Sequence, residues 1–529
     1  MADGMIQVSQ TLQTFLPENA FMEVITLLKK VNLKVLVERR YSDWLNGQGY
    51  SKSCENLDEK SQDREKIAAV IENLVQCAEP FIEDEGGWDK EEMLKHETQA
   101  SAVLKICQLL LSSLLNRDNQ LLAEKEFPVD AVFKKFILKK TCSCLVALCA
   151  VHMESHLWTS TASMALAHEL VSLICTNCQC PSVQELLCGC VEVESVVFNM
   201  VEESQSPNSL FPSGLFRHIL DYLRPHLLKN NWKKFPLACH GLVWCTLQIK
   251  HPYVGEHFAK LMSPLLLLID DYETENKTLG FKCLKHVIDN VNSAELQWYG
   301  RADVLFEASQ RHIYSNDPSL MRSLHPCLLS ILTVVEPSPK KAKFGRKTTK
   351  CDGLFQIILS SMEFESKIAV RKAYASHLKH FIEHMGITIL RHFKRLLKVI
   401  VSYLEVSDYP EEGTRLAVLD ALKVAMLQAW PRIPNHSSTI LKSLLKLLVD
   451  ATDSSAYIAV QAFELLNQKT AECLVVLLRC CGKQVEEQLK ELQGVGHKEV
   501  EECVEKVLQE TGCATNTSVQ SAHQMYNVT

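Results

Sequence analysis

Glycine and proline are scarce in this chain of 529 residues, which contains 19 glycines and 17 prolines, about half of the usual share. Both residue types mark turns and interrupt helices. Their scarcity predicts long helices joined by short connections. Convincing runs of four to eight β-branched or aromatic residues with a period of two, which would predict strands, are also missing. The sequence therefore indicates an all-α protein.

Motifs for nucleotide and hydrolase chemistry are absent as well. The patterns G-x-G-x-x-G, G-x-x-x-x-G-K-[ST] and G-x-S-x-G do not occur. These patterns carry the phosphate-binding loops and the nucleophile of several large enzyme classes. We therefore expect the protein to have no enzymatic activity and no cofactor.

The chain also lacks an excess of positive charge. Lysine and arginine number 56 against 63 aspartates and glutamates, which gives a net charge of −7. Such a chain has no overall field that would hold a polyanion, so no direct nucleic-acid binding is expected. The fractions of hydrophobic (47%) and charged (22%) residues are typical of a folded globular protein and exclude a disordered one.

Secretory and membrane-spanning signals are not visible. Met1–Phe15 contains no basic segment followed by an apolar stretch. The densest apolar stretch, Cys142–Val151, is far shorter than the roughly 20 residues that span a bilayer. We therefore expect no membrane partner and a cytoplasmic location, with the nucleus as a second compartment. In that setting the 21 cysteines should be reduced and pack as small hydrophobic side chains.

A helical pattern repeats in the C-terminal two thirds of the chain. Small apolar triplets such as Leu237-Ala-Cys and Leu416-Ala-Val open a helix at intervals of 41 to 48 residues. This spacing is close to the period of HEAT and armadillo repeats, in which antiparallel helix pairs bury their apolar faces by stacking on their neighbours. We therefore predict a HEAT/armadillo-like α-solenoid. The triplets begin at Leu237, Leu279, Leu320, Ile368, Leu416 and Ile458.

The composition divides the chain into four regions. Residues 1–201 are predicted to form irregular helices, and residues 202–214 a linker rich in polar residues and proline. Residues 215–493 should hold the repeat array, interrupted by a basic loop at 337–353. Residues 494–529 should form a C-terminal helix followed by a disordered tail after Gly512. The N-terminal helices are expected at 18–44, 63–79, 91–116, 129–152 and 161–175.

One segment matches a metalloprotease pattern. His380, Glu383 and His384 follow H-x-x-E-H, which would place two imidazole ligands of zinc and a general base on one helix. The same helix has an apolar face that includes Tyr374 and Phe381, so these histidines can equally form a solvated stripe on the polar face of a repeat. No metal site is predicted.

A cysteine cluster allows two interpretations. The spacing C-x2-C-x-C-x7-C-x-C could complete a tetrahedral zinc site. The flanking sequence reads as a turn between two helices, where thiols serve as small packing residues, and we favour this structural interpretation. The cluster consists of Cys175, Cys178, Cys180, Cys188 and Cys190.

Two basic segments are candidate contact surfaces. The loop from Lys340 to Lys350 could be a nuclear localisation signal, an electrostatic contact or simply a solvated loop. The second segment has helical spacing i, i+3, i+4, i+7, which predicts a basic ridge that could bind an acidic partner or face solvent. The loop contains Lys340, Lys341, Lys343, Arg346, Lys347 and Lys350, and the ridge Arg391, Lys394, Arg395 and Lys398.

Two long segments resemble one known family. Residues 263–291, with DDYETENKTLGFKCLKHVIDNV, and residues 389–421, with LRHFKRLLKVIVSYLEVSDYPEEGTRLAVLDAL, are similar to the Tti-two family of Tel-two-interacting proteins. The resemblance implies a non-enzymatic α-solenoid subunit of the Triple-T co-chaperone complex, with two larger helical-repeat partners. It further implies that the complex acts with the ninety-kilodalton heat-shock chaperone to mature and stabilise phosphatidylinositol-3-kinase-related kinases, supporting DNA-damage and growth signalling.

The resemblance also suggests which residues contact a partner. For the residues from Asp270 to Gly280 a structural role is the alternative. The acidic pair Asp270 and Asp271 can cap the following helix and pair with Lys277, and Gly280 lets helices approach closely. A transport-type HEAT protein or GTPase-binding adaptor is the alternative function, since the repeat pattern alone does not separate it from a co-chaperone subunit. The suggested residues are Asp270, Asp271, Tyr272, Asn276, Lys277 and Gly280, and at the end of the ridge helix Tyr403 and Glu405.

Overall fold

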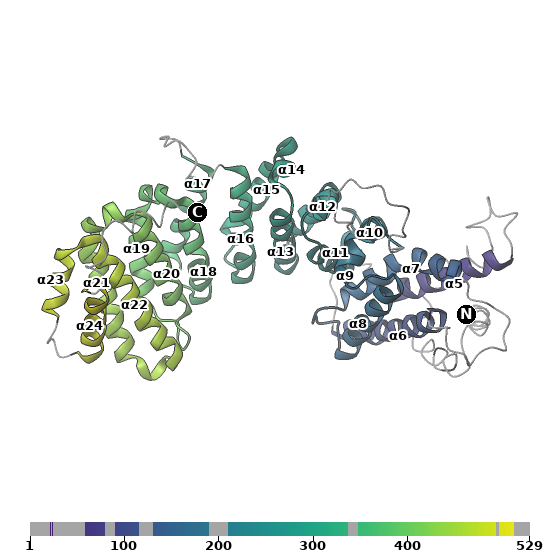
Figure 1. The fold of residues 1–529 in the computed structure, drawn as a ribbon, viewed down its shortest axis with the longest axis horizontal. Helices are drawn as coiled ribbons and strands as arrows, with labels where there is room; N and C mark the ends of the chain where they lie inside the picture. Colours follow the sequence, from purple (N-terminus) through teal and green to yellow (C-terminus); the bar gives the residue numbers. More distant parts are fainter. Residues whose placement is uncertain are drawn as a thin grey trace, which may run out of the picture. The chain divides into compact units, whose positions relative to one another are not determined.

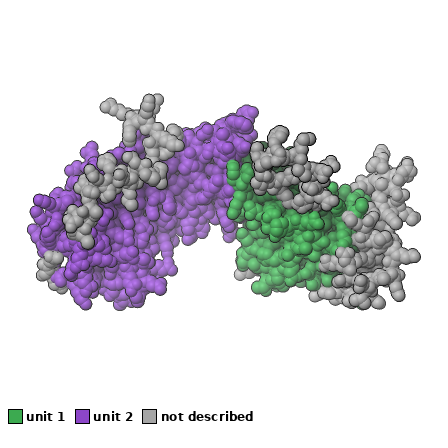
Figure 2. All heavy atoms as spheres, viewed as in Figure 1, with its two compact units in different colours: residues 1–268 green, residues 269–529 purple. Residues whose placement is uncertain are grey.

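The protein is built from α-helices. The computed structural model describes residues 59–79, 90–115, 131–189, 210–336, 348–492 and 497–512, with Met22 and Val24, and these residues form no strand. The predicted helix at 18–44, most of the predicted linker at 202–214 and the predicted tail after Gly512 therefore lie outside the described residues. Two compact units, Met1–Leu268 and Ile269–Thr529, make up the chain, and Figure 2 colours them green and purple.

The first unit contains the N-terminal helices and the beginning of the repeats. Four helices predicted from the sequence are confirmed within a few residues at each end. Helix α7 lies at the centre of the unit and packs against α5, α10 and α11, while α6 packs against α8. The helices are α5 (Glu59–Ala78), α6 (Lys90–Leu115), α7 (Ala131–Val151), α8 (Thr161–Asn177), α9 (Val183–Cys188), α10 (Phe216–Leu223), η2 (Trp232–Lys234), α11 (Pro236–Gln248) and α12 (Tyr253–Ile269).

The second unit is a stack of antiparallel helix pairs, which confirms the predicted α-solenoid. The second helices of successive pairs, α13, α16, α18, α20 and α22, pack against one another in that order (Figure 1). The first helices α17, α19 and α21 form the other layer, and each packs against the second helix of its own pair. The layers are α13 (Thr274–Asn290), α16 (Pro318–Val335), α18 (Ile368–Met385), α20 (Gly413–Gln428) and α22 (Val460–Cys481), and α15 (Arg301–Gln310), α17 (Lys350–Phe364), α19 (Phe393–Leu404) and α21 (Ser437–Asp453).

Short helices and a C-terminal pair complete the second unit. Helix α24 packs against α21 and α22, so it covers the last repeat. These elements are α14 (Ser293–Gln297), η3 (Trp298–Gly300), η4 (Arg311–Tyr314), η5 (Gly386–Arg391), η6 (Trp430–His436), η7 (Ser455–Tyr457), α23 (Lys483–Glu491) and α24 (Lys498–Gly512).

The apolar triplets mark the second helix of each pair, as predicted. They lie at or near the start of α11, α13, α16, α18, α20 and α22. In α20, for example, Val418, Leu419 and Leu422 recur with the period of the helix, and all three are buried in the helix that packs against α18 and α22. Burial of each such side chain is worth roughly 1.5–3 kcal/mol.

Two helices meet the length and composition of a membrane span, contrary to the expectation from apolar runs. They are Glu91–Leu115 and Pro318–Val335, and 56% and 50% of their apolar windows are buried inside the protein. Both helices pack against neighbours in their own units, as core helices of a helical protein do.

Candidate interaction surfaces

The turn between α12 and α13 carries the first group of predicted contact residues. Asp271 is buried, and its Oδ2 accepts a hydrogen bond of 2.7 Å from Asn276 Nδ2. Asn276 Nδ2 also donates to Glu273 Oε2 at 3.0 Å. Asp270 lies next to His312, with 3.8 Å between Oδ1 of Asp270 and Nε2 of His312. Asp271 and Asn276 therefore fix the turn from inside.

Only part of this group reaches the surface. Tyr272 and Asp270 are exposed, whereas Gly280 is buried in α13. Gly280 therefore offers no exposed surface, since α13 packs against α16, and its contact with a partner stays a prediction. The structural alternative was wrong in one respect, because no side-chain hydrogen bond caps the start of α13.

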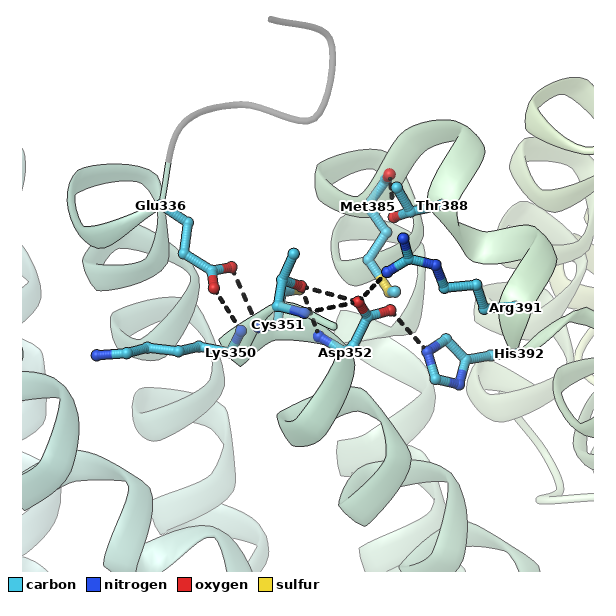
Figure 3. Close-up of polar contacts among 9 residues, drawn as sticks. Glu336, Lys350, Cys351, Asp352, Met385, Thr388, Arg391 and His392 are labelled. Atoms are coloured by element: carbon cyan, nitrogen blue, oxygen red, sulfur yellow. Dashed lines mark hydrogen bonds and ion pairs between the residues drawn. The ribbon is translucent and has the colours of Figure 1, made fainter. Parts of the chain in front are cut away.

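Around the start of α17 a polar cluster joins three helices (Figure 3). Asp352 lies in the first turn of α17, and its side chain is only 4% exposed. Its Oδ2 accepts hydrogen bonds from Thr349 N at 2.9 Å and from Arg391 Nη1, while its Oδ1 lies 2.9 Å from His392 Nε2. The Thr349 hydroxyl accepts from Asp352 N at 3.0 Å, which completes a capping box.

Two opposing effects act on the Asp352 carboxyl. Burial alone raises its pKa, but the hydrogen bonds from Thr349 and His392 and the charge of Arg391 outweigh burial, and the pKa lies below its usual value of 3.8.

Glu336, directly after α16, accepts hydrogen bonds from the backbone N–H groups of Lys350 and Cys351. The predicted basic loop therefore ends earlier than expected, because α17 begins at Lys350. Its residues Lys340–Lys347 lie outside the described residues.

The basic ridge is partly neutralised within the protein. Arg391 belongs to η5 and not to α19, so the predicted single helical face was wrong. Arg391 binds Asp352, and Arg395 forms a bidentate pair with Glu363 through Nε at 3.0 Å and Nη2 at 2.8 Å. Lys394 and Lys398 are the exposed lysines of the ridge. The ridge therefore presents these two lysines beside the paired, partly exposed Arg391 and Arg395.

Tyr403 is not a surface residue, and its contact with a partner stays a prediction. Its side chain is fully buried, and the guanidinium of Arg371 lies 3.8 Å from the centre of its ring. Arg371 also donates to the carbonyl oxygens of Ser402 at 2.9 Å and Glu365 at 3.2 Å. Burial raises the pKa of Tyr403. Glu405, in contrast, is exposed and pairs with Lys446 at 3.0 Å.

The histidines of the H-x-x-E-H segment lie on α18. His380 Nδ1 is 3.2 Å from Glu383 Oε2, and both side chains are largely exposed. His377, on the same helix, is half-buried, its ring centre lies 5.7 Å from that of His325, and burial lowers its pKa to about 4. No group of three or more histidine, cysteine or acidic side chains among the described residues is arranged to hold a metal ion.

The cysteine cluster packs at the turn between α8 and α9. Cys175, Cys178 and Cys180 are buried and Cys188 is half-buried, while Cys190 lies outside the described residues. Burial raises the pKa of Cys175 and of Cys188 to about 11. At neutral pH both are therefore thiols, which are poor metal ligands and poor nucleophiles.

Sequence reasoning missed the Asp352 cluster and the Arg371 contact. Thr349 and Asp352 have the spacing [ST]-x-x-[DE] ahead of an apolar run, which predicts a capping box and could have located the start of α17. No local signal links Arg371 to Tyr403, because the two residues come from different repeats.

Comparison with known proteins finds one family. The sequence profile of the Tti2 family matches residues 144–411. TELO2-interacting protein 2 of Mus musculus is 37% identical over 360 residues, which cover 68% of this chain and 67% of the mouse protein. TELO2-interacting protein 2 of Homo sapiens is 31% identical over 447 residues, which cover 84% of this chain and 82% of the human protein.

Solved structures of similar shape are remote. Kap95p bound to RanGDP has a TM-score of 0.46 and 12% identity, and the match covers 98% of this chain and 69% of Kap95p. Importin beta in an ammonium sulfate condition has a TM-score of 0.45 and 12% identity, covering 94% of this chain and 66% of importin beta. Likeness this remote says nothing about function.

Proposed function

This chain belongs to the Tti2 family, and we propose that it acts as a non-catalytic scaffold that binds a Tel2-type partner. The relatives in mouse and man carry the name TELO2-interacting protein 2, which supports such a partner. The observation that carries the proposal is the continuous stack of second helices from α13 to α22, which offers a long surface for another protein.

The proposal extends to the complex in which the scaffold works. The chain is one of three subunits of the Triple-T co-chaperone complex, beside two larger helical-repeat proteins. With the ninety-kilodalton heat-shock chaperone this complex stabilises and matures phosphatidylinositol-3-kinase-related kinases, and it does so in the cytoplasm and in the nucleus. The repeat array contributes contact area to the assembly and no chemistry.

Exposed residues of the second unit are the proposed contacts. Lys394 and Lys398 present positive charge on α19, and Asp270 and Tyr272 lie at the turn before α13. Glu405 lies at the end of α19 and pairs with a lysine of α21. Exposed ion pairs contribute little to folding, so these residues are available to a partner at small cost.

Acute removal of the protein from cells tests the function. We expect the amounts of the related kinases to fall while their messenger RNA stays constant, because immature kinases lose their co-chaperone. Re-expression of the wild-type chain should restore the kinases, and a Lys394→Glu/Lys398→Glu variant should restore them only partly. Unchanged kinase amounts after complete removal of the protein would contradict the proposal.

A further inference from the structure

The turns between the first and second helix of each pair in the second unit share an unusual feature. Each turn presents an aromatic side chain to solvent, between 45% and 86% exposed. Single exposed apolar residues are normal on any protein, but one in each of five successive turns is a pattern. The aromatic residues are Tyr272, Tyr314, Phe364, Tyr409 and Tyr457, and Ile368, Val406 and Val460 are exposed beside them.

These turns lie along one edge of the stack, which we name the turn edge. The second helices pack side by side in order, and each begins at its turn, so their N-termini share an edge. Direct contacts join neighbouring turns: the rings of Tyr409 and Tyr457 are 5.9 Å apart, and Ala459 N donates to Pro410 O at 3.0 Å. The aromatic side chains therefore lie along one edge, and the rings of Tyr409 and Tyr457 are neighbours on it.

Helix capping accounts for some carboxylates of the turn edge but not for the aromatic rings. Asp317 accepts from Leu320 N at 2.8 Å, Asp408 from Thr414 N at 2.9 Å, and Glu365 from Lys367 N at 2.8 Å. Carboxylates at these positions stabilise the N-termini of helices. Exposed tyrosine and phenylalanine rings contribute nothing to capping, so folding alone does not explain them.

The turn edge is also acidic. The turn segments 270–275, 314–317, 364–368, 405–412 and 453–460 contain a single cation, Lys367. Asp271, Asp408 and Glu412 of these segments are buried, but six carboxylates are exposed. The exposed ones are Asp270, Glu273, Glu275, Glu405, Glu411 and Asp453. Glu405 and Glu411 pair with Lys446 and Lys372 in exposed contacts, which are weak and exchange readily with other cations. A ligand for the turn edge should therefore be positively charged.

We propose that the turn edge binds an extended, arginine- and lysine-rich segment of a partner protein. Guanidinium and ammonium groups stack favourably on the faces of tyrosine and phenylalanine rings, and the flanking carboxylates meet their charge. Neighbouring helices lie about 10 Å apart, so five turns span about 40 Å, the length of about 12 extended residues. This inference rests on the proposed scaffold function, because it specifies one kind of partner segment.

A binding measurement with the full chain tests the inference. The probe is a labelled peptide of about 12 residues that alternates arginine with serine and glycine, matching the length of the turn edge. We expect the Tyr409→Ala/Tyr457→Ala variant to bind it about tenfold more weakly than the wild type, and higher salt to weaken binding further. A peptide with glutamate in place of arginine should not bind.

The control variant is Trp430→Ala, which removes an exposed aromatic side chain from η6, between a second helix and the next first helix. It should bind the arginine peptide like the wild type. Equal affinity of the wild type and the Tyr409→Ala/Tyr457→Ala variant, both with unchanged thermal unfolding, would overturn the inference, as would equal binding of the glutamate peptide. Peptide binding is independent of kinase amounts in cells, so failure here is distinguishable from failure of the scaffold function.

Discussion

The Asp352→Ala substitution is expected to lower the free energy of opening of the α17–α19 region by about 3 kcal/mol. The substitution removes the side-chain cap of α17 and leaves Arg391 and His392 without their shared carboxylate. Arg391 keeps a third of its side chain exposed, so most of the loss comes from the cap of α17 and from the buried hydrogen bonds that Asp352 accepts. Repeat proteins can open locally, so the effect should concentrate in this region.

Hydrogen exchange of backbone amides measures this effect. Peptides from α17 and α19 should exchange about a hundredfold faster in the variant, whereas those from α22 should change little. Asp303→Ala is a matched control, because Asp303 is exposed and its pair with Lys350 is a surface contact. Exchange rates in α17 that are the same in Asp352→Ala, Asp303→Ala and the wild type would contradict the assigned role.

The pH dependence of the Asp352 contribution has a defined sign. Because the folded protein lowers the pKa of Asp352 from 3.8, the stabilisation is fully present above that value. It is lost as the pH falls through the lower pKa of the folded state. The difference between the wild type and Asp352→Ala should therefore stay constant at neutral pH and narrow only in strong acid.

The His325→Phe substitution is expected to stabilise the protein in acid. His325 is buried in α16, and neither ring nitrogen has a hydrogen-bond partner among the described residues. Its ring lies against Tyr374, His377 and Phe381 at 5.6 to 5.8 Å. Burial, with a smaller contribution from His377, lowers its pKa from 6.5 to about 3. Between these values the unfolded chain binds a proton that the folded protein does not, so stability falls as the pH drops below 6.5.

Urea unfolding at two pH values tests this prediction. At about pH 4.5, keeping His325 neutral in the folded protein lowers the free energy of unfolding by about 3 kcal/mol relative to neutral pH. The His325→Phe variant has no proton to bind at this position and should not show this loss. At about pH 7.5 the two proteins should differ by less than about 1.5 kcal/mol, because the ring sizes are similar. The control is His380→Asn, since His380 is largely exposed and should not alter acid stability. An unchanged acid sensitivity of His325→Phe would show that His325 is not a source of acid lability.

The fold could be predicted from the sequence because its main signal is periodic. Apolar residues such as Leu416 and Leu419 recur with the helix period, and the triplets recur with the repeat period, so element type and stacking order follow from the sequence. Helix starts were less certain. The basic run before Thr349 predicted a loop to residue 353, while the capping box of Thr349 and Asp352 begins α17 at Lys350.

The candidate surfaces were harder to predict because exposure depends on neighbouring repeats. Tyr403 lies at the end of an amphipathic helix, and its ring is buried in the folded stack, where Arg371 of the preceding helix lies against it. Likewise, His377 lies on the polar side of its own helix but is covered by His325 of the preceding repeat. The recurrence of aromatic residues on the turn edge emerges only when the unequal repeats are aligned by their structure.

The most direct test of the scaffold function is the composition of the complex formed in cells. The tagged chain would be purified from cell lysate, and its partners quantified by mass spectrometry. We expect two large helical-repeat proteins in amounts near that of the chain, one of them a Tel2-type protein, and related kinases in smaller amounts. Recovery of nuclear-transport components or a small GTPase in their place would contradict it.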